Sequence, residues 1–449
     1  MVSFISFCSL LILVLCAVKP KYGLPLYIVY SLFFPYLQIG NLALVGRVAA
    51  LLFLIFFFLN YRNKIKNVDY SPFKPFFFLY IAQFFLLFIQ DPTYFPIGFD
   101  RWNTYVLTTI TYALLIYTDV QTNYRGIIVY NNALLISSLI IILYGLFLTS
   151  IPGINPYQIL ISPLFGGEFN EAYALGDSYL SSSTSSLADG RLFGRISSVF
   201  SHPMLYGLNL GFFFVVVTYV LYERKKYRLL VLFEICLIAA VVTCGVRSAI
   251  AALVLTLIVG ILNLKRTRLV IMSILAFLLV INILPMVSPA VNEYLLSMFD
   301  SSGNVVQGSS LKMRYNQFIG CFGVIQDCLF TGKGFEWTSD YLSKHEIHPV
   351  LLNFESLIFM IICNSGLLGL VIWGIFICMF FKFSRKIKNK NQQTAILCLF
   401  TYYIMYSLIT GDYYYLKYFM LYYAVLVGGL SFKSNLYIYG TQYKKMLYR

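Results

Sequence analysis

Long apolar stretches follow one another along almost the whole chain, with short polar segments between them. A helix that crosses a membrane needs about 20 consecutive apolar residues. Thirteen stretches approach that length, and the first two could instead form one broken or re-entrant pair, which would leave twelve. The predicted spans are residues 2–18, 24–38, 41–60, 73–90, 104–119, 126–149, 204–222, 228–244, 246–263, 268–287, 353–381, 393–411 and 415–431.

Two long segments interrupt this pattern. Residues 150–203 contain an Ile-Pro-Gly-Ile-Asn-Pro sequence and a Ser/Thr run, and residues 288–352 contain Ser/Gly clusters and the sequence Gly332-Lys-Gly334. Long connections that are not linkers are usually functional, so we expect the chemistry in these two loops. No soluble domain interrupts the series, which predicts a single integral membrane domain over residues 1–449.

The composition supports an all-α polytopic membrane protein. Hydrophobic residues make up 59% of the chain and charged residues 11%, against roughly 45–50% and 25% in soluble domains. A soluble fold of this size could not cover so much apolar surface with so little charge. The nine cysteines form no Cys-x-x-Cys pair and no Cys/His cluster, so we expect no metal site, no redox site and no cofactor.

The distribution of basic residues predicts the orientation. Of the 33 lysines and arginines, 23 lie in alternate connections that fall on one side of the predicted spans. Lys/Arg-rich loops are cytoplasmic, so both long loops, 150–203 and 288–352, should be extracytoplasmic. The net charge of +15 then reflects topology and anionic lipid, and no compact basic module points to nucleic acid.

Basic residues on the outer side run against this bias and are therefore informative. Arg195, Arg247 and Arg314 lie near predicted membrane boundaries or in the second loop. An arginine binds phosphate with a bidentate, permanently charged fork, so an outward cluster would suit a lipid-linked phosphate or pyrophosphate. The alternative is that each arginine only reaches the interface or pairs with a loop acid.

Two of these arginines stand directly beside predicted helix starts. Arg195 precedes the sequence Phe200-Ser-His202-Pro203, in which a polar residue before proline marks the beginning of a helix. We therefore place Arg195 and His202 at the outer mouth of the 204–222 span, where His202 could also be an ordinary interfacial residue. The sequence Val246-Arg247-Ser248 opens the next outer helix in the same way.

The second loop and the helix after it contribute further candidates. Arg314 is followed by an apolar stretch that ends at Gly332-Lys333-Gly334, where free backbone N–H groups beside a lysine could hold an anion. Glu355 stands at the outer start of the 353–381 span, eleven residues before Gly366-Leu-Leu-Gly369. A carboxylate in that position could act as a general base, or it could be an ordinary interfacial acid.

Taken together, these patterns resemble the O-antigen ligase and polymerase superfamily of bacterial envelope enzymes. Members carry an outward Arg before a His/Asn-Pro-like helix start, similar to Arg195 to Pro203, and a Ser-Arg at a later helix start, similar to Arg247-Ser248. They also carry an Arg, a helix and a Gly-x-Gly in the large outer loop, similar to Arg314 and Gly332–Gly334. The resemblance covers about residues 191–370.

The resemblance implies a C-type glycosyltransferase that acts on undecaprenyl-pyrophosphate-linked oligosaccharide at the outer face of the bacterial cytoplasmic membrane. Ligases of the family have a histidine about eleven residues before the Gly-Leu-Leu-Gly-like sequence, and Glu355 occupies that position here. This departure favours a polysaccharide polymerase over a ligase that transfers glycan to lipid A-core. His348 could take the histidine role if the register differs, and a flippase and a chain-length regulator are expected partners.

A metal-independent mechanism fits these residues. No Asp-x-Asp pair is present, so Arg195, Arg247 and Arg314, with Lys333 and His202 nearby, would bind the pyrophosphate while Glu355 or His348 acts as base. The competing classes are a lipid-linked oligosaccharide flippase or other transporter, and a structural or regulatory membrane protein. A transporter would show ionisable residues at the membrane midplane rather than at the outer ends.

Overall fold

Within the residues that it describes, the computed structural model is all-helical apart from one hairpin with two residues in each strand. The strands are β1 (Gln38–Ile39) and β2 (Leu42–Ala43), which pair antiparallel with Gln38 opposite Ala43. The structure describes residues 18–34, 38–39, 42–43, 65–123, 126–151, 155–161, 196–200, 202–264, 311–345 and 348–429, with parts of 11–16 and 50–62. The predicted span 268–287, and most of 2–18 and 41–60, lie outside these residues.

The described helices follow the predicted order. The longer ones are α2 (Pro20–Phe33), α4 (Lys74–Ile89), α5 (Phe95–Thr122), α6 (Gly126–Leu148), α9 (Pro203–Glu223), α10 (Tyr227–Thr243), α11 (Arg247–Asn263), α14 (Leu311–Val324), α16 (Leu357–Ser384), α17 (Lys390–Ile409) and α18 (Tyr415–Gly428). The short ones are α7 (Pro156–Ile161), α15 (Trp337–Lys344), and the 3-10 turns η1 (Ile65–Asn67), η2 (Ser71–Phe73) and η4 (Gln326–Cys328).

Several of these helices have the length and composition of membrane spans. Within the described residues, four qualify: Ser71–Ile89, Gly126–Leu148, Pro203–Glu223 and Leu357–Ser384. The helices α11 and α18 are apolar but shorter. The chain is therefore a multi-pass membrane protein, as the apolar pattern predicts.

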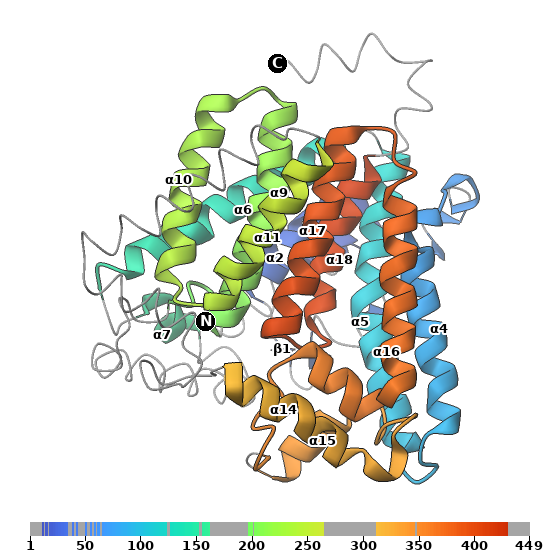
Figure 1. The fold of residues 1–449 in the computed structure, drawn as a ribbon. Coiled ribbons are helices and arrows are strands. Elements are labelled where there is room, and N and C mark those ends of the chain that lie inside the picture. The colour runs from blue at the N-terminus through green and yellow to red at the C-terminus, as the bar shows by residue number, and fades with distance from the viewer. Residues whose placement is uncertain are drawn as a thin grey trace.

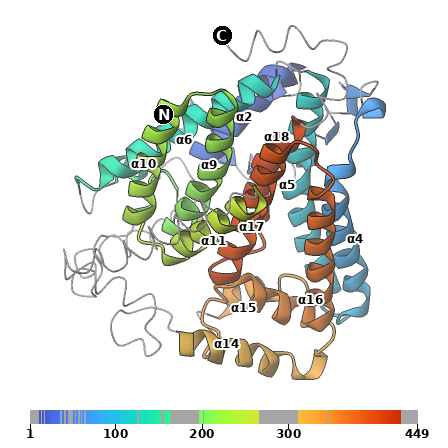
Figure 2. The same cartoon turned by 45° about the horizontal axis from the view of Figure 1, so that its top comes forward.

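Helices α14 and α15 lie across one end of the bundle that the longer helices form (Figures 1 and 2). We call this the α14 end. It is built from the predicted loop 288–352, of which residues 311–345 and 348–352 are described and are partly helical. Of the predicted loop 150–203, the structure describes α7 and residues 196–200, besides residues 150–151 and 155 and the start of α9.

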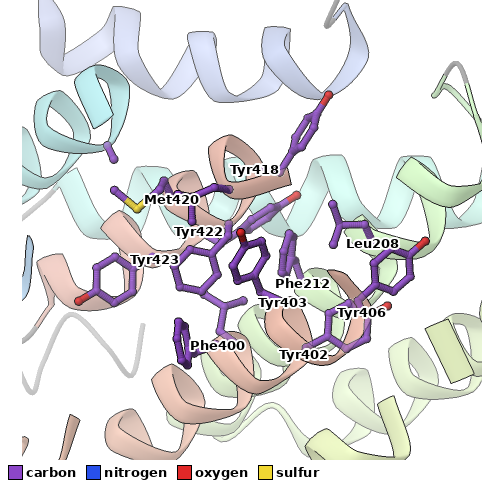
Figure 3. Packing of buried hydrophobic residues seen from close by; sticks show 14 of the residues in the cluster. Leu208, Phe212, Phe400, Tyr402, Tyr403, Tyr406, Tyr418, Met420, Tyr422 and Tyr423 are labelled. Atoms are coloured by element: carbon purple, nitrogen blue, oxygen red, sulfur yellow. The ribbon is translucent and has the colours of Figure 1, made fainter. Parts of the chain in front are cut away.

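Tyrosine side chains bind the helices to one another in the core. Tyr402 on α17 donates a hydrogen bond to the Gly207 carbonyl oxygen of α9 at 2.7 Å, and its ring lies where a side chain at Gly211 would stand. Tyr422 on α18 donates to Asn209 of α9 at 2.8 Å. The rings of Tyr402 and Tyr422 belong to the same buried cluster (Figure 3). A missing Cβ lets helices approach closely, and buried hydroxyls need such partners. The contact regions of α9, α17 and α18 are thereby fixed.

Helix α5 begins earlier than the predicted span 104–119. It starts at Phe95, with Pro96 in its first turn, where a missing N–H costs nothing. Asp91 stabilises the preceding turn by accepting the N–H of Thr93 at 2.8 Å. The consequence is that Arg101 belongs to the first turns of α5 rather than to a loop.

Helix α16 differs from the predicted span 353–381 at both its start and its middle. It begins at Leu357 and is broken at Gly366, whose φ of 60° and ψ of −155° are not helical. The segment 329–334 supplies hydrogen-bond partners for the backbone at the break. The N–H groups of Lys333 and Gly334 donate to the carbonyl oxygens of Cys363 and Asn364 at 2.9 and 3.1 Å. Gln90 of the α4–α5 connection donates to Asn364 O as well, at 2.8 Å. Irregular backbone inside a membrane protein persists only when it is satisfied in this way.

Candidate functional site

Four helix ends meet at the α14 end of the molecule. Tyr406, near the C-terminus of α17, donates to the Met204 carbonyl oxygen in the first turn of α9 at 2.5 Å. At Gly207, a Cβ would contact Val246 and Ala249 at the start of α11. Ser356, the residue before α16, donates to the Leu408 carbonyl oxygen at 2.6 Å. The starts of α9, α11 and α16 therefore surround the end of α17.

His202 begins α9, as the His-Pro sequence predicts. It is the N-cap residue, Pro203 follows in the first turn, and the His202 Nδ1 atom accepts the N–H of Met204 at 3.1 Å. An N-cap acceptor satisfies one of the free donors of a helix start. The His202 ring therefore has a structural role at the edge of the site.

Arg247 is placed by a tight turn between α10 and α11. Gly245 adopts a φ of 66°, which glycine reaches without steric cost, and Arg247 is the first residue of α11. Its neighbour Ser248 is buried. Arg247 thus lies at the start of α11, where the sequence predicts a helix to begin.

Arg314 and Glu355 form the centre of the site. The Nη2 atom of Arg314 lies 3.6 Å from the Glu355 Oε2 atom, and their side chains are 20% and 35% exposed. The Nη1 atom also donates to the Glu355 carbonyl oxygen at 3.4 Å and to Gln317 Oε1 at 3.5 Å. One guanidinium therefore holds both the backbone and the carboxylate of Glu355.

The positive charge of Arg247 acts on this pair. Burial lowers the pKa of Arg314, the carboxylate of Glu355 raises it, and the charge of Arg247 lowers it further. An arginine remains charged despite such shifts, so two cations and one carboxylate share the site. Two guanidinium groups close enough for their charges to interact would suit an anion with more than one negative charge.

A strained segment presents Glu355. Leu352 and Phe354 both have a φ of 51°, which is uncommon for residues other than glycine. Phe354 is fully buried, and its ring contacts Trp337, Tyr341 and His348 with centroid distances of 6.1, 6.0 and 5.6 Å. We call these three residues the Phe354 cage. The cage and the Ser356–Leu408 hydrogen bond fix the residues on either side of Glu355.

The hydrogen bonds of His348 are made within this segment. Its Nδ1 atom accepts the N–H groups of Val350 and Leu351 at 3.2 and 3.0 Å, and its backbone pairs with Leu352. Burial lowers its pKa. A ring nitrogen that accepts two N–H groups would lose both bonds on taking a proton, so His348 is poorly suited to be the base.

Lys333 lies apart from the arginines. It forms an ion pair with Asp327 at 3.2 Å, beyond the C-terminal end of α14, whereas Arg314 is near its start. Ten helical residues separate the two ends by about 15 Å at 1.5 Å per residue. The predicted anion-binding turn is also wrong, because the N–H groups of Gly332, Lys333 and Gly334 donate to the carbonyl oxygens of Cys328, Cys363 and Asn364. Arg195 lies outside the described residues.

A second group of charged residues, which the sequence does not predict, lies at the same end. Glu336 is 1% exposed and interacts electrostatically with Asp412, from the α17–α18 connection, and with Arg101 of α5. The three residues are far apart in the sequence, and each follows or precedes an apolar segment. The one local indication that Glu336 is buried is its place directly after Phe335, a large aromatic residue that is itself buried.

The comparison with protein families covers the centre of this site. Residues 231–374 match the family model described as O-Antigen ligase. The match runs from α10 to the second half of α16 and includes Arg247, Arg314 and Glu355, but not His202. No curated protein matches the chain closely enough to serve as a relative. This part of the chain is an O-antigen ligase domain, of the family of membrane glycan ligases and polymerases.

Proposed function

We propose that this chain, whose residues 231–374 form an O-antigen ligase domain, is a polysaccharide polymerase of a bacterial cytoplasmic membrane. It would join oligosaccharide repeat units that are linked to undecaprenyl pyrophosphate, for an O-antigen, capsule or exopolysaccharide. The observation that carries the proposal is the contact of Arg314 with Glu355 beside Arg247, at the meeting point of four helix ends.

The reaction needs a base and a site for a leaving anion. A hydroxyl oxygen of the acceptor sugar attacks the anomeric carbon of the donor, and the bond between that carbon and the pyrophosphate oxygen breaks. The hydroxyl proton passes to the Glu355 carboxylate, and undecaprenyl pyrophosphate leaves with the bonding electrons. A positioned base contributes about 10²–10⁴-fold to such a step.

The arginines supply the charge that the leaving group requires. The charges of Arg247 and Arg314 interact with each other, and a guanidinium holds a phosphate with two parallel hydrogen bonds. Because Arg314 also holds Glu355, binding of the pyrophosphate to Arg314 would place the donor beside the base. No energy source beyond the pyrophosphate linkage is needed.

The proposal places the α14 end outside the cytoplasm. The α9–α10 and α16–α17 connections, at the opposite end (Figure 1), contain Lys225, Lys226 and Lys386. In the sequence, 23 of the 33 lysines and arginines lie in the connections predicted to be on that side. Lys/Arg bias favours the cytoplasm for that end. The proposed donor would then be used after it has been moved to the outer leaflet, so a flippase is an expected partner.

A ligase is the second candidate, because the matching family model carries that description. In a ligase the acceptor would be lipid A-core instead of a second lipid-linked repeat unit. Glu355 at the position where ligases are expected to carry histidine favours the polymerase.

Reconstitution of the full chain decides between the two. Purified protein in lipid nanodiscs receives undecaprenyl-pyrophosphate-linked repeat units alone, or the same donor with lipid A-core. A ladder of products from the donor alone supports the polymerase. Products that form only when lipid A-core is present would support the ligase and contradict our proposal.

A further inference from the structure

The buried carboxyl group of Glu336 is incompletely satisfied. Glu336 adopts a left-handed backbone, with a φ of 62°, and directly precedes α15. Its Oε2 atom accepts the hydroxyl of Ser339 at 2.6 Å, but its Oε1 atom has no hydrogen-bond partner among the described residues. A buried charged oxygen without a partner is costly, so this carboxyl favours its neutral form.

Asp412 on the α17–α18 connection lies close to Glu336. Phe335, which precedes Glu336, packs against Tyr413, which follows Asp412, with ring centroids 5.6 Å apart. Asp412 is half-buried as a residue, but its carboxyl is enclosed, and its Oδ1 atom lies 3.4 Å from the N–H group of Tyr414. Burial raises the pKa of Asp412, whereas the N–H groups of Tyr414 and Tyr413 and the charge of Lys417 lower it. Because Asp412 has partners that stabilise its ionised form and the Oε1 atom of Glu336 has none among the described residues, the proton is held more readily by Glu336.

Buried tyrosine hydroxyls interact with this pair. Those of Tyr94, Tyr105 and Tyr403 have no hydrogen-bond partner within the described part of the chain, whereas the Tyr413 hydroxyl interacts with Ser365 and Asn364. Tyr94, Tyr105 and Tyr413 interact electrostatically with Glu336, and Tyr403 with Asp412.

The residues that follow Glu336 connect it to the catalytic segment. Trp337 comes next in the chain, and with Tyr341 it belongs to the Phe354 cage. Asp412 lies four residues after Leu408, which accepts the hydrogen bond of Ser356. Phe354 and Ser356 flank Glu355. Both carboxyls of the pair therefore sit on segments that hold Glu355 in place.

We propose that Glu336 and Asp412 form a protonation-dependent lock that positions Glu355 and opens when the outer medium becomes alkaline. With one proton, the pair holds the start of α15 against the α17–α18 connection. Loss of that proton places two negative charges in an enclosed site, which separates the two segments and loosens the Phe354 cage. Glu336 and Asp412 are positioning residues, and neither contacts the reacting atoms. The effect on activity rests on the proposed function, whereas the lock itself does not.

The charges around Glu336 determine where the lock opens. Burial and the charge of Asp412 raise the pKa of Glu336, Ser339 and Arg101 lower it, and together these effects bring it to about 8. The other groups that face the pair are Tyr94, Tyr105, Tyr403, Tyr413, Tyr414, Lys417 and Tyr418.

The sign of the stability effect follows from the pKa. The folded pKa of Glu336 lies above the ordinary value of 4.5, so the folded chain binds the proton more tightly than the unfolded chain. The stabilising contribution is complete below about pH 4.5 and is lost as the pH rises through about 8.

Trp337 provides a direct measurement. Full-length protein with Trp102→Phe and Trp373→Phe keeps Trp337 as its single tryptophan. The emission of Trp337 should change in one step near pH 8, with no substrate present. Glu336→Gln should remove the step, whereas Asp327→Asn, at a side chain that is 87% exposed, should leave it unchanged.

Two further variants test the charge coupling with Glu336 intact. Asp412→Asn removes the charge that raises the pKa of Glu336, so the midpoint should move to lower pH. Arg101→Gln removes the charge that lowers it, so the midpoint should move to higher pH. A flat titration in the parent protein, an unchanged step in Glu336→Gln, or midpoint shifts of the opposite sign would overturn the proposal.

Activity provides the second measurement. A carboxyl with a pKa of about 8 keeps roughly one tenth of its protons at pH 9, so glycan transfer should fall about tenfold between pH 7 and 9. Glu336→Gln should abolish that fall. If the fluorescence step is present but no glycan transfer occurs at any pH, the proposed function fails and the lock stands. If transfer occurs with the same pH profile in Glu336→Gln, the lock fails and the function stands.

Discussion

Arg314 combines two roles in one side chain. It contacts the backbone and the carboxylate of Glu355, and together with Arg247, whose charge acts on it, it would bind the proposed pyrophosphate. A lysine would keep the charge but would offer only a point ammonium at the end of a flexible stem.

Replacing either arginine with lysine should therefore abolish most activity. We expect Arg247→Lys and Arg314→Lys to lose most chain elongation, because an ammonium cannot reproduce the bidentate contact with phosphate. Product length on a gel, from a deletion strain carrying each variant at normal protein level, measures the loss.

Arg385→Lys is the matched control, because Arg385 is exposed at the C-terminal end of α16, at the opposite end of the molecule. Normal ladders from both site variants would show that these arginines only anchor their helices.

His348 should behave as a structural residue. His348→Asn keeps an acceptor that can reach the N–H groups of the turn, so activity should be largely retained, whereas His348→Ala should lose thermal stability through the Phe354 cage. Thermal unfolding and the elongation assay are measured on the same preparations. A stable but inactive His348→Asn would instead make His348 the base.

At the scale of the elements, the break in α16 joins the second loop to the membrane helices. Gly366 takes a conformation that only glycine reaches readily, and a Cβ there would lie 2.6 Å from the carbonyl oxygens of Leu329 and Phe330. The Gly332–Gly334 turn thus stabilises the break in α16 by hydrogen bonds, and its N–H groups are not free to bind an anion.

Gly366→Ala should destabilise the protein strongly. The backbone conformation alone costs roughly 1–3 kcal/mol for a residue with a Cβ, before the contact with two carbonyl oxygens is counted. Gly374→Ala is the control in the same helix, because a Cβ at Gly374 would have nothing within 4 Å, and it should stabilise by roughly 0.5–1 kcal/mol. Thermal unfolding in detergent compares the two, and equal melting temperatures would contradict a strained break.

The sequence predicts helix starts better than helix interruptions. His202-Pro203 and Gly245 to Arg247 are local signals, and the structure has both starts where they are expected. The early start of α5 also has local signals in Pro96 and the Asp91 turn, which the apolar pattern does not include. The break at Gly366, in contrast, depends on partners that are distant in the sequence, such as Gln90 and Lys333. For the same reason Arg314 and Glu355 are predictable as candidates one by one, while the pairing of Glu336 with Asp412 is not.

At the scale of the whole molecule, the chemistry depends on which side of the membrane the α14 end faces. Reporter fusions near residues 170 and 330 should report an extracytoplasmic location, and those near 226, 266, 386 and 445 a cytoplasmic one. The reason is the concentration of 23 of 33 basic residues in the second group of connections. A cytoplasmic signal at residue 330 would place the site in the wrong compartment for the proposed donor.

The most direct test of the mechanism is the rate of glycan transfer by Glu355→Gln. The change keeps the size and polarity of the side chain but removes its ability to take a proton, and Arg314 can still be contacted by the amide oxygen. With reconstituted full-length protein and lipid-linked repeat units, we expect the rate to fall about 10²–10⁴-fold while folding is preserved. Glu355→Asp should retain part of the activity. A Glu355→Gln protein that elongates chains at the wild-type rate would show that Glu355 is not the base and would contradict the mechanism.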